Sequence, residues 1–204
     1  NGCALVGGET AEMPDLYTDG EYDLAGTIVG IVEKDAILDG TTVQSGDVLL
    51  GLPSNGLHTN GFTLARKVLF DAFDVDDTPD ALGGATVGEE LLRVHRSYLA
   101  DIQALINAGL VNGLVHVTGG GIPDNTRRVV PDDLTFEVDY SAWKRPAIFD
   151  LIQAQGDVPE EDMRRTFNLG IGLIAIVPEE RVDAAARAVA ERDQAPVRIG
   201  HVQG

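Results

Sequence analysis

The stretch from Gly46 to Leu69, GDVLLGLPSNGLHTNGFTLARKVL, holds a strand, a polar loop and a helix in direct succession. Asp47–Leu52 is apolar and predicts a short buried strand. From Gly61 to Phe73 the apolar residues recur at helical spacing, which predicts a helix with one apolar face. Between the two, Ser54–Gly61 combines turn-forming residues with His, Thr and two Asn, at the end of a strand where ligands usually bind. The stretch therefore predicts an α/β fold with a site at this loop.

Further strands and helices follow along the chain. The pattern predicts strands at Leu114–Val117, Leu134–Val138, Leu169–Val177 and Val197–Val202. It predicts helices at Ser97–Ala108, Pro146–Gln155 and Glu179–Glu191, and a short helix after Gly121. Because strands alternate with helices, although not strictly one to one, we expect a two-layer α/β (α+β) domain with helices on one face of a mixed sheet.

The beginning of the chain has a different character. Cys3–Val6 and Tyr22–Val32 are apolar and rich in β-branched residues, and they predict two strands. Two strands do not fold alone, so we expect them to belong to a sheet whose other strands lie outside this chain. The stretch 33–47 is polar and turn-rich, and we place a boundary in it between residues 1–38 and residues 39–204.

Acidic residues exceed basic residues by a wide margin. The 204 residues include 33 Asp and Glu against 15 Lys and Arg, for a formal net charge of -18. A basic surface for the nucleic-acid backbone is hard to build from this composition, which argues against nucleic-acid binding. The acidic excess is spread along the chain, and only three of the basic residues are Lys. We therefore favour a protein that works at high salt over an ordinary acidic cytosolic enzyme.

Membrane and secretory proteins are also disfavoured. No apolar run approaches the roughly 20 residues of a membrane helix, and the first residues lack the basic start and apolar core of a signal peptide. Cys3 is the single cysteine, so an internal disulfide or a cysteine-only zinc site is excluded. We expect a cytoplasmic protein without a membrane partner.

The first of four polar, glycine-containing clusters is Gly7–Pro14, GGETAEMP. Glu9 and Glu12 stand three residues apart beside a Gly-Gly turn, where carboxylates can serve a metal ion or act as a general base. The simpler structural interpretation is a short helix capped by Thr10, with the acids favoured by the helix dipole. Spacing alone slightly favours the structural interpretation.

Two further clusters each lie between a strand and a helix. For Ser54–Gly61 the structural alternative is an Asn-Gly turn with a helix cap, but the density of polar groups favours a functional site. The cluster His116–Asn125, HVTGGGIPDN, has three glycines that let backbone amides approach an anion such as phosphate. We favour this interpretation over a flexible hinge, although the pattern differs from a Walker loop.

The fourth cluster, Arg164–Gly172, leads into an apolar strand. Thr166 and Asn168 precede two glycines, a pattern that suits a bound ligand and a closely packed helix equally well. The remaining histidines, His95 and His201, are expected to be structural or surface residues.

In this order and spacing, the clusters resemble the aminoimidazole ribonucleotide synthetases, also called phosphoribosylformylglycinamidine cyclo-ligases. The resemblance runs from the first residue to nearly the last, and GGETAEMP, GLHTNG and TGGG together are specific to this family within its superfamily. Departures within it are small: Asp124 where the family usually has Glu, and Phe62 where it often has Tyr. Family members carry a long further segment in front, including an Asp- and Gly-rich nucleotide loop.

The resemblance implies an ATP-dependent ring closure. ATP would phosphorylate the formyl oxygen of formylglycinamidine ribonucleotide, the amidine nitrogen would attack that carbon, and phosphate would leave. Mg²⁺ would neutralise the triphosphate. The resemblance also implies a homodimer around a shared barrel, with residues 1–38 as the end of the ATP-binding first domain and 39–204 as the C-terminal α/β domain of the family fold.

Candidate site residues follow from the same resemblance. Glu9 would act in catalysis and bind the metal ion, with Gly8 and Thr10 beside the nucleotide. His58 and Asn60 would orient the reacting groups. The residues expected to bind the substrate and its phosphate are Thr118, Gly119, Gly120, Gly121, Asn125, Thr166 and Asn168.

Two alternatives remain open at this point. One is another ATP-using enzyme of the same superfamily, such as formylglycinamidine ribonucleotide synthetase or thiamine-monophosphate kinase. The other is a non-catalytic binding or dimerisation fragment. Because the family's nucleotide loop is missing from these residues, we expect the chain by itself to be inactive.

Overall fold

The computed structural model of the chain describes residues 2–190 and 195–204. The chain divides into two compact units, Asn1–Ile37 and Leu38–Gly204. No helix in the described part of the chain is long and apolar enough to cross a membrane.

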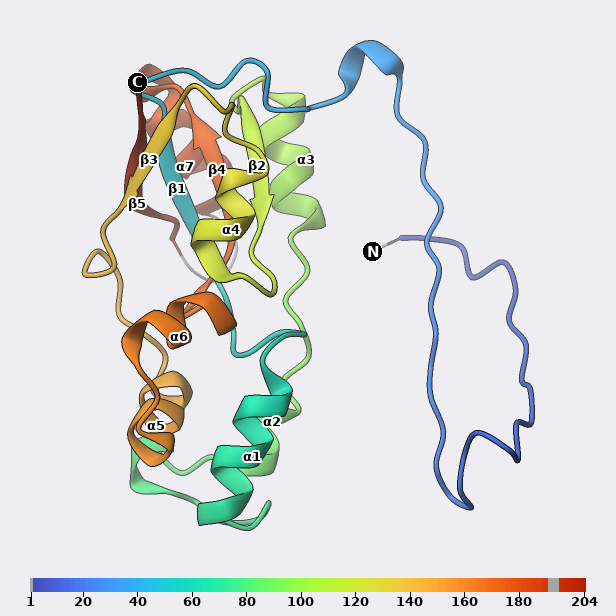
Figure 1. The fold of residues 1–204 in the computed structure, drawn as a ribbon. Coiled ribbons are helices and arrows are strands. Elements are labelled where there is room, and N and C mark those ends of the chain that lie inside the picture. The colour runs from blue at the N-terminus through green and yellow to red at the C-terminus, as the bar shows by residue number, and fades with distance from the viewer. Residues whose placement is uncertain (1, 191–194) are drawn as a thin grey trace. The chain divides into compact units, whose positions relative to one another are not determined.

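The first unit has almost no regular structure. Among its described residues, 2–37, the one regular element is the short 3-10 helix η1 (Lys34–Ala36), and the blue trace of this unit in Figure 1 carries no arrows. The strands expected at Cys3–Val6 and Tyr22–Val32 are absent, so this prediction is wrong for the chain as it stands. Apolar side chains there are open to solvent, with Leu5 97% and Ile31 102% exposed. The physical reason is that a strand forms only with a partner, and the sheet described here contains no strand from this unit.

The second unit is built on a five-stranded sheet. Its strands are β1 (Val48–Pro53), β2 (Gly113–His116), β3 (Thr135–Val138), β4 (Ile171–Val177) and β5 (Val197–Gln203), in the order β2-β4-β1-β5-β3. The α/β (α+β) class and the positions of these strands are as predicted. The expected mixed sheet is wrong, because all four strand pairs are antiparallel. β4 lies between β1 and β2 and is buried at every position, as its sequence IGLIAIV favours.

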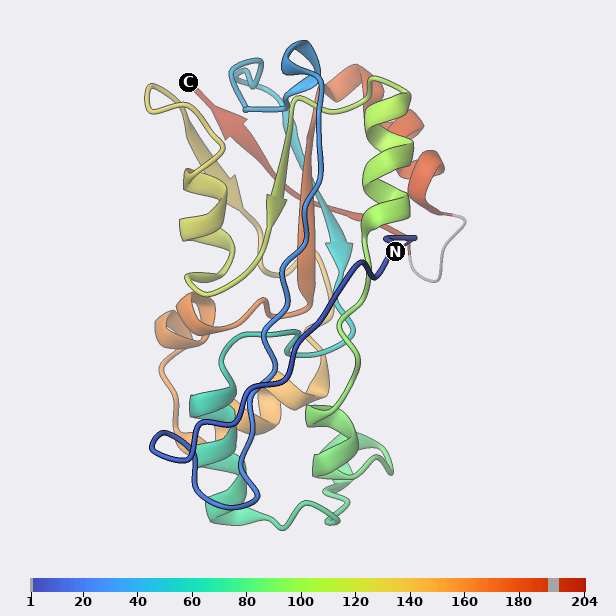
Figure 2. The same ribbon diagram turned by 90° about the vertical axis from the view of Figure 1, so that its right-hand side faces the viewer.

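Helices cover both faces of the sheet rather than the one face expected. Side chains alternate along β4, so that Leu173 packs with α3 (Leu99–Asn107) and α7 (Val182–Ala190), whereas Ile174 packs on the opposite face. The opposite face is covered by α4 (Gly121–Arg127), as Figure 2 shows. The expectation failed because β4 is apolar at every position and therefore has two faces to bury.

A separate group of helices lies beyond one end of the sheet (Figure 1). It consists of α1 (Phe62–Ala72), α2 (Val87–Leu91), α5 (Ala147–Gly156), α6 (Glu160–Thr166) and the 3-10 turn η2 (Asp80–Leu82). These elements share their own core, in which Leu69, Phe149, Met163 and Phe167 are fully buried. Neither α2 nor α6 was predicted from the sequence. The signal for α2 was the capping box of Thr86 and Glu89, in which each side chain accepts a hydrogen bond from the backbone amide of the other residue.

Three helix starts also differ from the prediction. Tyr98, not Ser97, is the N-cap residue of α3, and the Ser97 hydroxyl lies 3.5 Å from the Leu99 amide. Pro146 precedes α5 as its N-cap residue. The 3-10 turn η3 (Glu179–Arg181) precedes α7, where one continuous helix was expected.

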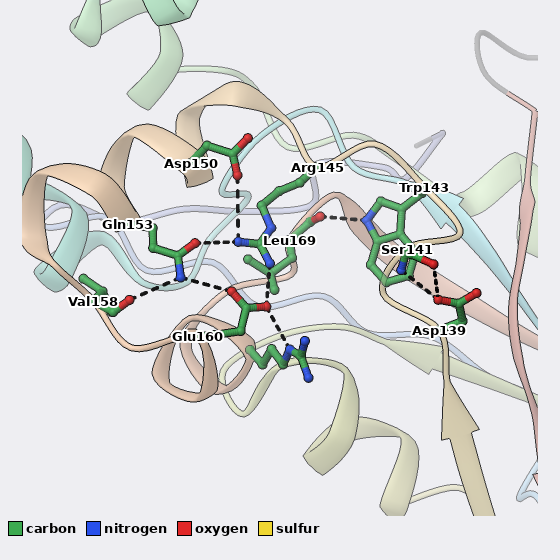
Figure 3. A network of polar contacts seen from close by, with 10 residues as sticks. Asp139, Ser141, Trp143, Arg145, Asp150, Gln153, Val158, Glu160 and Leu169 are labelled. Atoms are coloured by element: carbon green, nitrogen blue, oxygen red, sulfur yellow. Dashed lines mark hydrogen bonds and ion pairs between the residues drawn. The ribbon is translucent and has the colours of Figure 1, made fainter.

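A polar network joins α5, α6 and the segment before α5 (Figure 3). The Arg145 guanidinium donates to Glu160 Oε1 at 2.6 Å and to Gln153 Oε1 at 2.8 Å, and Arg164 Nε donates to Glu160 Oε1 at 2.9 Å. Hydrogen bonds from Arg145 first, and then from Arg164 and Gln153, lower the pKa of Glu160 to about 2. Nearby, the Trp143 indole N–H donates to the Leu169 carbonyl at 2.8 Å, which holds this segment against the entry to β4.

Candidate functional site

The loop Ser54–Gly61 joins β1 to α1 and has an unusual backbone. His58 adopts a left-handed conformation with φ of 62°, which residues other than glycine rarely do. Gly61 has φ of 83°, and the Phe167 ring lies where its Cβ would be, so only glycine fits there. The loop is therefore held in one specific shape by packing.

The His58 side chain is buried, with 7% of the residue exposed. Its Nε2 lies 2.9 Å from Asn55 Oδ1, and its Nδ1 is buried without a hydrogen-bond partner. The ring packs against Gly172 of β4, where an added Cβ would come within 2.5 Å of His58 Cε1. Burial, followed by the nearby His95, His116 and Arg96, lowers the pKa of His58 to about 3. His58 is therefore neutral at pH 7, and its Nδ1 faces the sheet rather than solvent.

Two further histidines lie beside His58. The His95 ring stacks on the His58 ring with centroids 3.9 Å apart and planes at 17°, and the His116 ring lies 5.5 Å from that of His95. His95 is half-buried and His116 is exposed at the end of β2. Burial, and then His116, lower the pKa of His95. His95 was expected to be a structural or surface residue, and no spacing in the sequence could have placed it here, because it approaches the loop from a distant part of the chain.

The segment Arg93–Tyr98 fastens the loop in place. Asn55 Nδ2 donates to the Val94 carbonyl at 2.8 Å, and Asn55 Oδ1 accepts from the Arg96 amide at 3.3 Å. The Pro53 carbonyl accepts from the Tyr98 hydroxyl at 2.8 Å and from Arg96 Nη1 at 3.1 Å. These contacts and the ring stack bind one segment to the other at several points.

The glycine triplet follows β2 and leads into α4. The Gly120 amide donates to the Arg165 carbonyl at 2.9 Å, and the Gly121 amide donates to the Thr118 carbonyl at 3.0 Å. A Cβ on Gly121 would collide with the Arg164 carbonyl. Two of the three glycine amides are therefore used within the protein, and Gly121 is required for close backbone packing; the binding of an anion by this loop stays a prediction.

Asn125 holds the triplet from inside. It is 4% exposed, and its Nδ2 donates to the Gly121 carbonyl at 2.7 Å while its Oδ1 accepts from the Thr118 hydroxyl at 3.0 Å. The Arg128 guanidinium also donates to Asn125 Oδ1, at 3.2 Å. Asn125 thus holds the glycine triplet in position by hydrogen bonds within the protein.

The two loops meet at Asn60 and Gly119. Asn60 Oδ1 lies 3.4 Å from the position that a Cβ on Gly119 would occupy, and Asn60 Nδ2 donates to the Thr59 hydroxyl at 3.2 Å. Gly119 is exposed and Asn60 is half-buried. The structure therefore brings the predicted residues of the second and third clusters together, with Asn60, Thr118 and Gly119 toward the accessible side.

The fourth cluster, Arg164–Gly172, helps to hold the Ser54–Gly61 loop in place through the buried side chain of Asn168. Asn168 is 4% exposed; its Oδ1 accepts from the Ser54 hydroxyl at 2.7 Å and the Gly170 amide at 2.8 Å, and its Nδ2 donates to the Gly56 carbonyl at 2.9 Å. Asn168 was expected to bind the substrate or its phosphate, but its polar atoms are engaged inside the protein. Thr166 is half-buried at the end of α6, next to the Arg165 carbonyl that holds Gly120.

The residues of the first cluster lie in the other unit. Gly8, Glu9, Thr10 and Glu12 are exposed and carry no regular structure, so the helix that Thr10 was to cap is absent. In the residues that the structure describes, no group of three or more His, Cys, Asp or Glu side chains is placed to hold a metal ion. The catalytic and metal-binding roles of Glu9 stay predictions.

Comparisons with known proteins show the family of this chain. Residues 44–204 match the family model described as AIR synthase related protein, C-terminal domain. The chain is 48% identical over 202 residues to a phosphoribosylformylglycinamidine cyclo-ligase of an Anaeromyxobacter species, covering 99% of this chain and 59% of the relative. Proteins of the same name from Sorangium cellulosum and Bifidobacterium longum are 49% and 43% identical, each covering 98% of this chain and 59% of the relative. The chain thus spans about three-fifths of the length of these relatives.

Two of the similar solved structures have low sequence identity to this chain. An Escherichia coli HypE, a hydrogenase maturation protein, has a TM-score of 0.48 at 18% identity over 80% of this chain and 45% of its own. Thermotoga maritima PurL complexed with AMPPCP has a TM-score of 0.49 at 12% identity, over 84% of this chain and 24% of its own. The family model matches most of the second unit, from before β1 to the end of β5. The chain therefore belongs to the family of AIR synthase related proteins, whose C-terminal domain it carries over residues 44–204.

Proposed function

We propose that this chain is part of an enzyme that closes the imidazole ring of aminoimidazole ribonucleotide, in purine biosynthesis. One observation carries the proposal: relatives named phosphoribosylformylglycinamidine cyclo-ligase align over 98–99% of this chain at 43–49% identity. The contact between the Ser54–Gly61 loop, at Asn60, and the glycine triplet, at Gly119, supports the proposal, because both loops follow strand ends where ligands bind.

The proposed reaction is a phosphorylation followed by a cyclisation. The formyl oxygen of formylglycinamidine ribonucleotide attacks the γ-phosphorus of ATP, and ADP leaves. The amidine nitrogen then attacks the activated carbon, the C–O bond breaks and phosphate departs with the oxygen, while the nitrogen loses a proton. Asn60 would orient the reacting groups, and Thr118 with Gly119 would contact the substrate phosphate.

Other residues would act indirectly, by holding the two loops in position. His58, Gly120, Gly121, Asn125 and Asn168 hold the two loops in shape, as their buried contacts indicate. Thr166 is proposed to border the site.

ATP and Mg²⁺ are the proposed co-substrate and metal ion. Mg²⁺ is commonly bound by one or two carboxylates together with substrate phosphates. Glu9 fits that chemistry as one exposed carboxylate, with Gly8 and Thr10 proposed to approach the nucleotide. Residues 1–38 would belong to the ATP-binding domain, residues 39–204 to the C-terminal domain, and the enzyme would be a cytoplasmic homodimer.

The test is substrate-dependent release of phosphate. We expect no release by the 204-residue chain with ATP and formylglycinamidine ribonucleotide, and release once the part of the Anaeromyxobacter relative that this chain does not span is added. In that assembly, Asn60→Ala and Glu9→Gln should each lower turnover about a hundredfold. His201→Gln and Glu21→Gln are the matched controls, since neither has a proposed role.

Two results would favour the alternatives. A folded assembly that binds the added part but releases no phosphate would support a non-catalytic fragment. ATP consumption with thiamine monophosphate, and none with formylglycinamidine ribonucleotide, would support another enzyme of the superfamily.

The acidic composition supports a further proposal, adaptation to high salt. Unpaired carboxylates repel one another, and the repulsion fades as the Debye length falls to about 3 Å near 1 M salt. We expect the melting temperature to climb steeply with KCl, beyond the effect of an osmolyte at matched water activity. A melting temperature that does not change with KCl would instead support an ordinary acidic cytosolic enzyme.

A further inference from the structure

Three of the four histidines of this chain lie in one cluster, in which His95 stacks on His58 and the His116 ring is tilted by 46° against the His95 ring. The chain has 33 acidic residues, yet no ion pair within the described residues joins a histidine to a carboxylate. A carboxylate beside a histidine would stabilise the imidazolium. In this cluster, positive charge could form on a histidine that has no ion pair with a carboxylate within the described residues.

Only two of the three rings are open to a ligand. His58 is buried, with Nε2 at Asn55 and Nδ1 against Gly172. His95 is half-buried and His116 is exposed, and their ring centroids lie 5.5 Å apart. At that separation the nitrogens of both rings can reach the oxygens of one tetrahedral anion through charge-assisted hydrogen bonds.

The charged groups around the pair come from several elements. Arg96 and Tyr98 lie at the start of α3, where the Arg96 guanidinium is 5.2 Å from the Tyr98 ring centre. Arg96 also pairs with buried Asp101 at 3.6 Å and donates to the Pro53 carbonyl. On α4, the Asp124 side chain packs against Gly120. The carboxylates of Asp101 and Asp124 thus face Arg96 and the glycine triplet, and within the described residues neither forms an ion pair with His95 or His116.

Chain connectivity links the pair to the proposed phosphate position. His116 ends β2 two residues before Thr118, and Gly119 meets Asn60, which follows His58 by two residues. We propose that His95 and His116 together bind the phosphate group of an anionic ligand and take up a proton from solution as they do so. This deepens the proposed function, on which it rests for the presence of phosphorylated ligands at these loops.

The expected behaviour follows from linkage. A bound dianion supplies the missing countercharge and favours the imidazolium, so the affinity should rise as the pH falls. For each proton taken up, the dissociation constant should change about tenfold per pH unit. The protonated pair would also bring cationic charge to a chain whose basic residues are few.

The probe is inorganic sulfate, because sulfate does not itself titrate near neutral pH and any proton taken up must go to the protein. Titration calorimetry at pH 7 in two buffers of different ionisation enthalpy gives the number of protons. We expect uptake by the unaltered chain, loss of the uptake and at least tenfold weaker binding in His95→Gln and His116→Gln, and no change in His201→Gln. Circular dichroism of each variant confirms the fold; His116 is exposed, so His116→Gln keeps the test decisive even if His95→Gln is destabilised.

Sulfate binding without proton uptake, uptake that persists in His116→Gln, or no sulfate binding at all would each overturn the inference. The experiment uses neither ATP nor the cyclisation substrate. Failure of the proposed reaction would therefore leave the sulfate result standing, and failure of the sulfate result would leave the reaction assay unaffected.

Discussion

Two segments of this chain have nearly the same strand-forming character but opposite structures. Tyr22–Val32, YDLAGTIVGIV, and β4, Ile171–Val177, IGLIAIV, are both apolar, rich in β-branched residues and interrupted by glycine. β4 is buried at every position between two antiparallel neighbours. Tyr22–Val32 is exposed at every position and forms no strand.

The difference shows that intrinsic preference alone does not make a strand. β4 exchanges ladder hydrogen bonds with β1 and β2 and has apolar cores on both faces. The same kind of sequence without partners keeps its backbone groups bonded to water and gains no burial. A strand-forming sequence therefore forms a strand only when neighbouring strands are present. Four pairs of variants test the difference between the packed unit and the exposed segment.

The largest effect is expected from removing a buried side chain of β4. Ile174→Ala should lower the free energy of unfolding of the second unit by about 2–5 kcal/mol, because Ile174 is fully buried in a packed core. Ile28→Ala, the matched change in the exposed segment, should leave it unchanged, since Ile28 is 76% exposed. Urea unfolding followed by circular dichroism measures both. Equal losses would mean that the first segment is packed in solution.

The next effect concerns glycines in the two segments. Gly172→Ala should cost about 1–3 kcal/mol, because the new methyl group would collide with the Tyr98 hydroxyl and the His58 ring. Gly30 has no atom within 4 Å of an added Cβ, so Gly30→Ala should be neutral. Thermal unfolding compares the two variants. A neutral Gly172→Ala would contradict the close packing of His58 on β4.

The buried His58 ring, which packs against Gly172 of β4, should make the stability of the second unit depend on pH, whereas the exposed segment Tyr22–Val32 contains no histidine. The pKa of His58 is lowered from 6.5 to about 3 in the folded protein, so between these values the unfolded chain binds the extra proton and stability falls as the pH falls. From pH 6.5 to pH 5 the loss should be about 1.5 kcal/mol. His58→Gln should remove this part of the slope and His201→Gln should keep it. Urea titrations at several pH values give the slopes; identical slopes in both variants would refute the burial of His58.

The smallest effect is expected for Glu160, a partly exposed carboxylate with two arginine partners, compared with Glu9, an exposed carboxylate of the first unit. Glu160→Gln should lower stability by less than about 1 kcal/mol at pH 7, since partly exposed ion pairs are screened by solvent. Because the pKa of Glu160 is lowered to about 2, its contribution is present above about pH 4.5 and is lost as the pH falls toward 2. Glu9→Gln should not change the unfolding of the second unit. Acid unfolding curves that are the same for Glu160→Gln and the unaltered chain would contradict the network of Figure 3.

The local pattern of the sequence determined much of the second unit. Apolar periodicity placed all five strands and most of the longer helices, and the polar loops after β1 and β2 marked Asn60, Thr118 and Gly119 as candidates. Short elements such as α2 and α6 were missed, since five or seven residues are too few for periodicity to register.

Only the tertiary structure decided which elements became neighbours. It made every strand pair antiparallel, placed helices on both faces of the sheet, left Tyr22–Val32 without a partner, turned Asn168 inward and stacked His95 on His58. The physical reason is that spacing along a chain governs contacts within one helix or strand. Pairing, burial and ring stacking depend on residues far apart in sequence, whose positions are set by the packing of the whole unit.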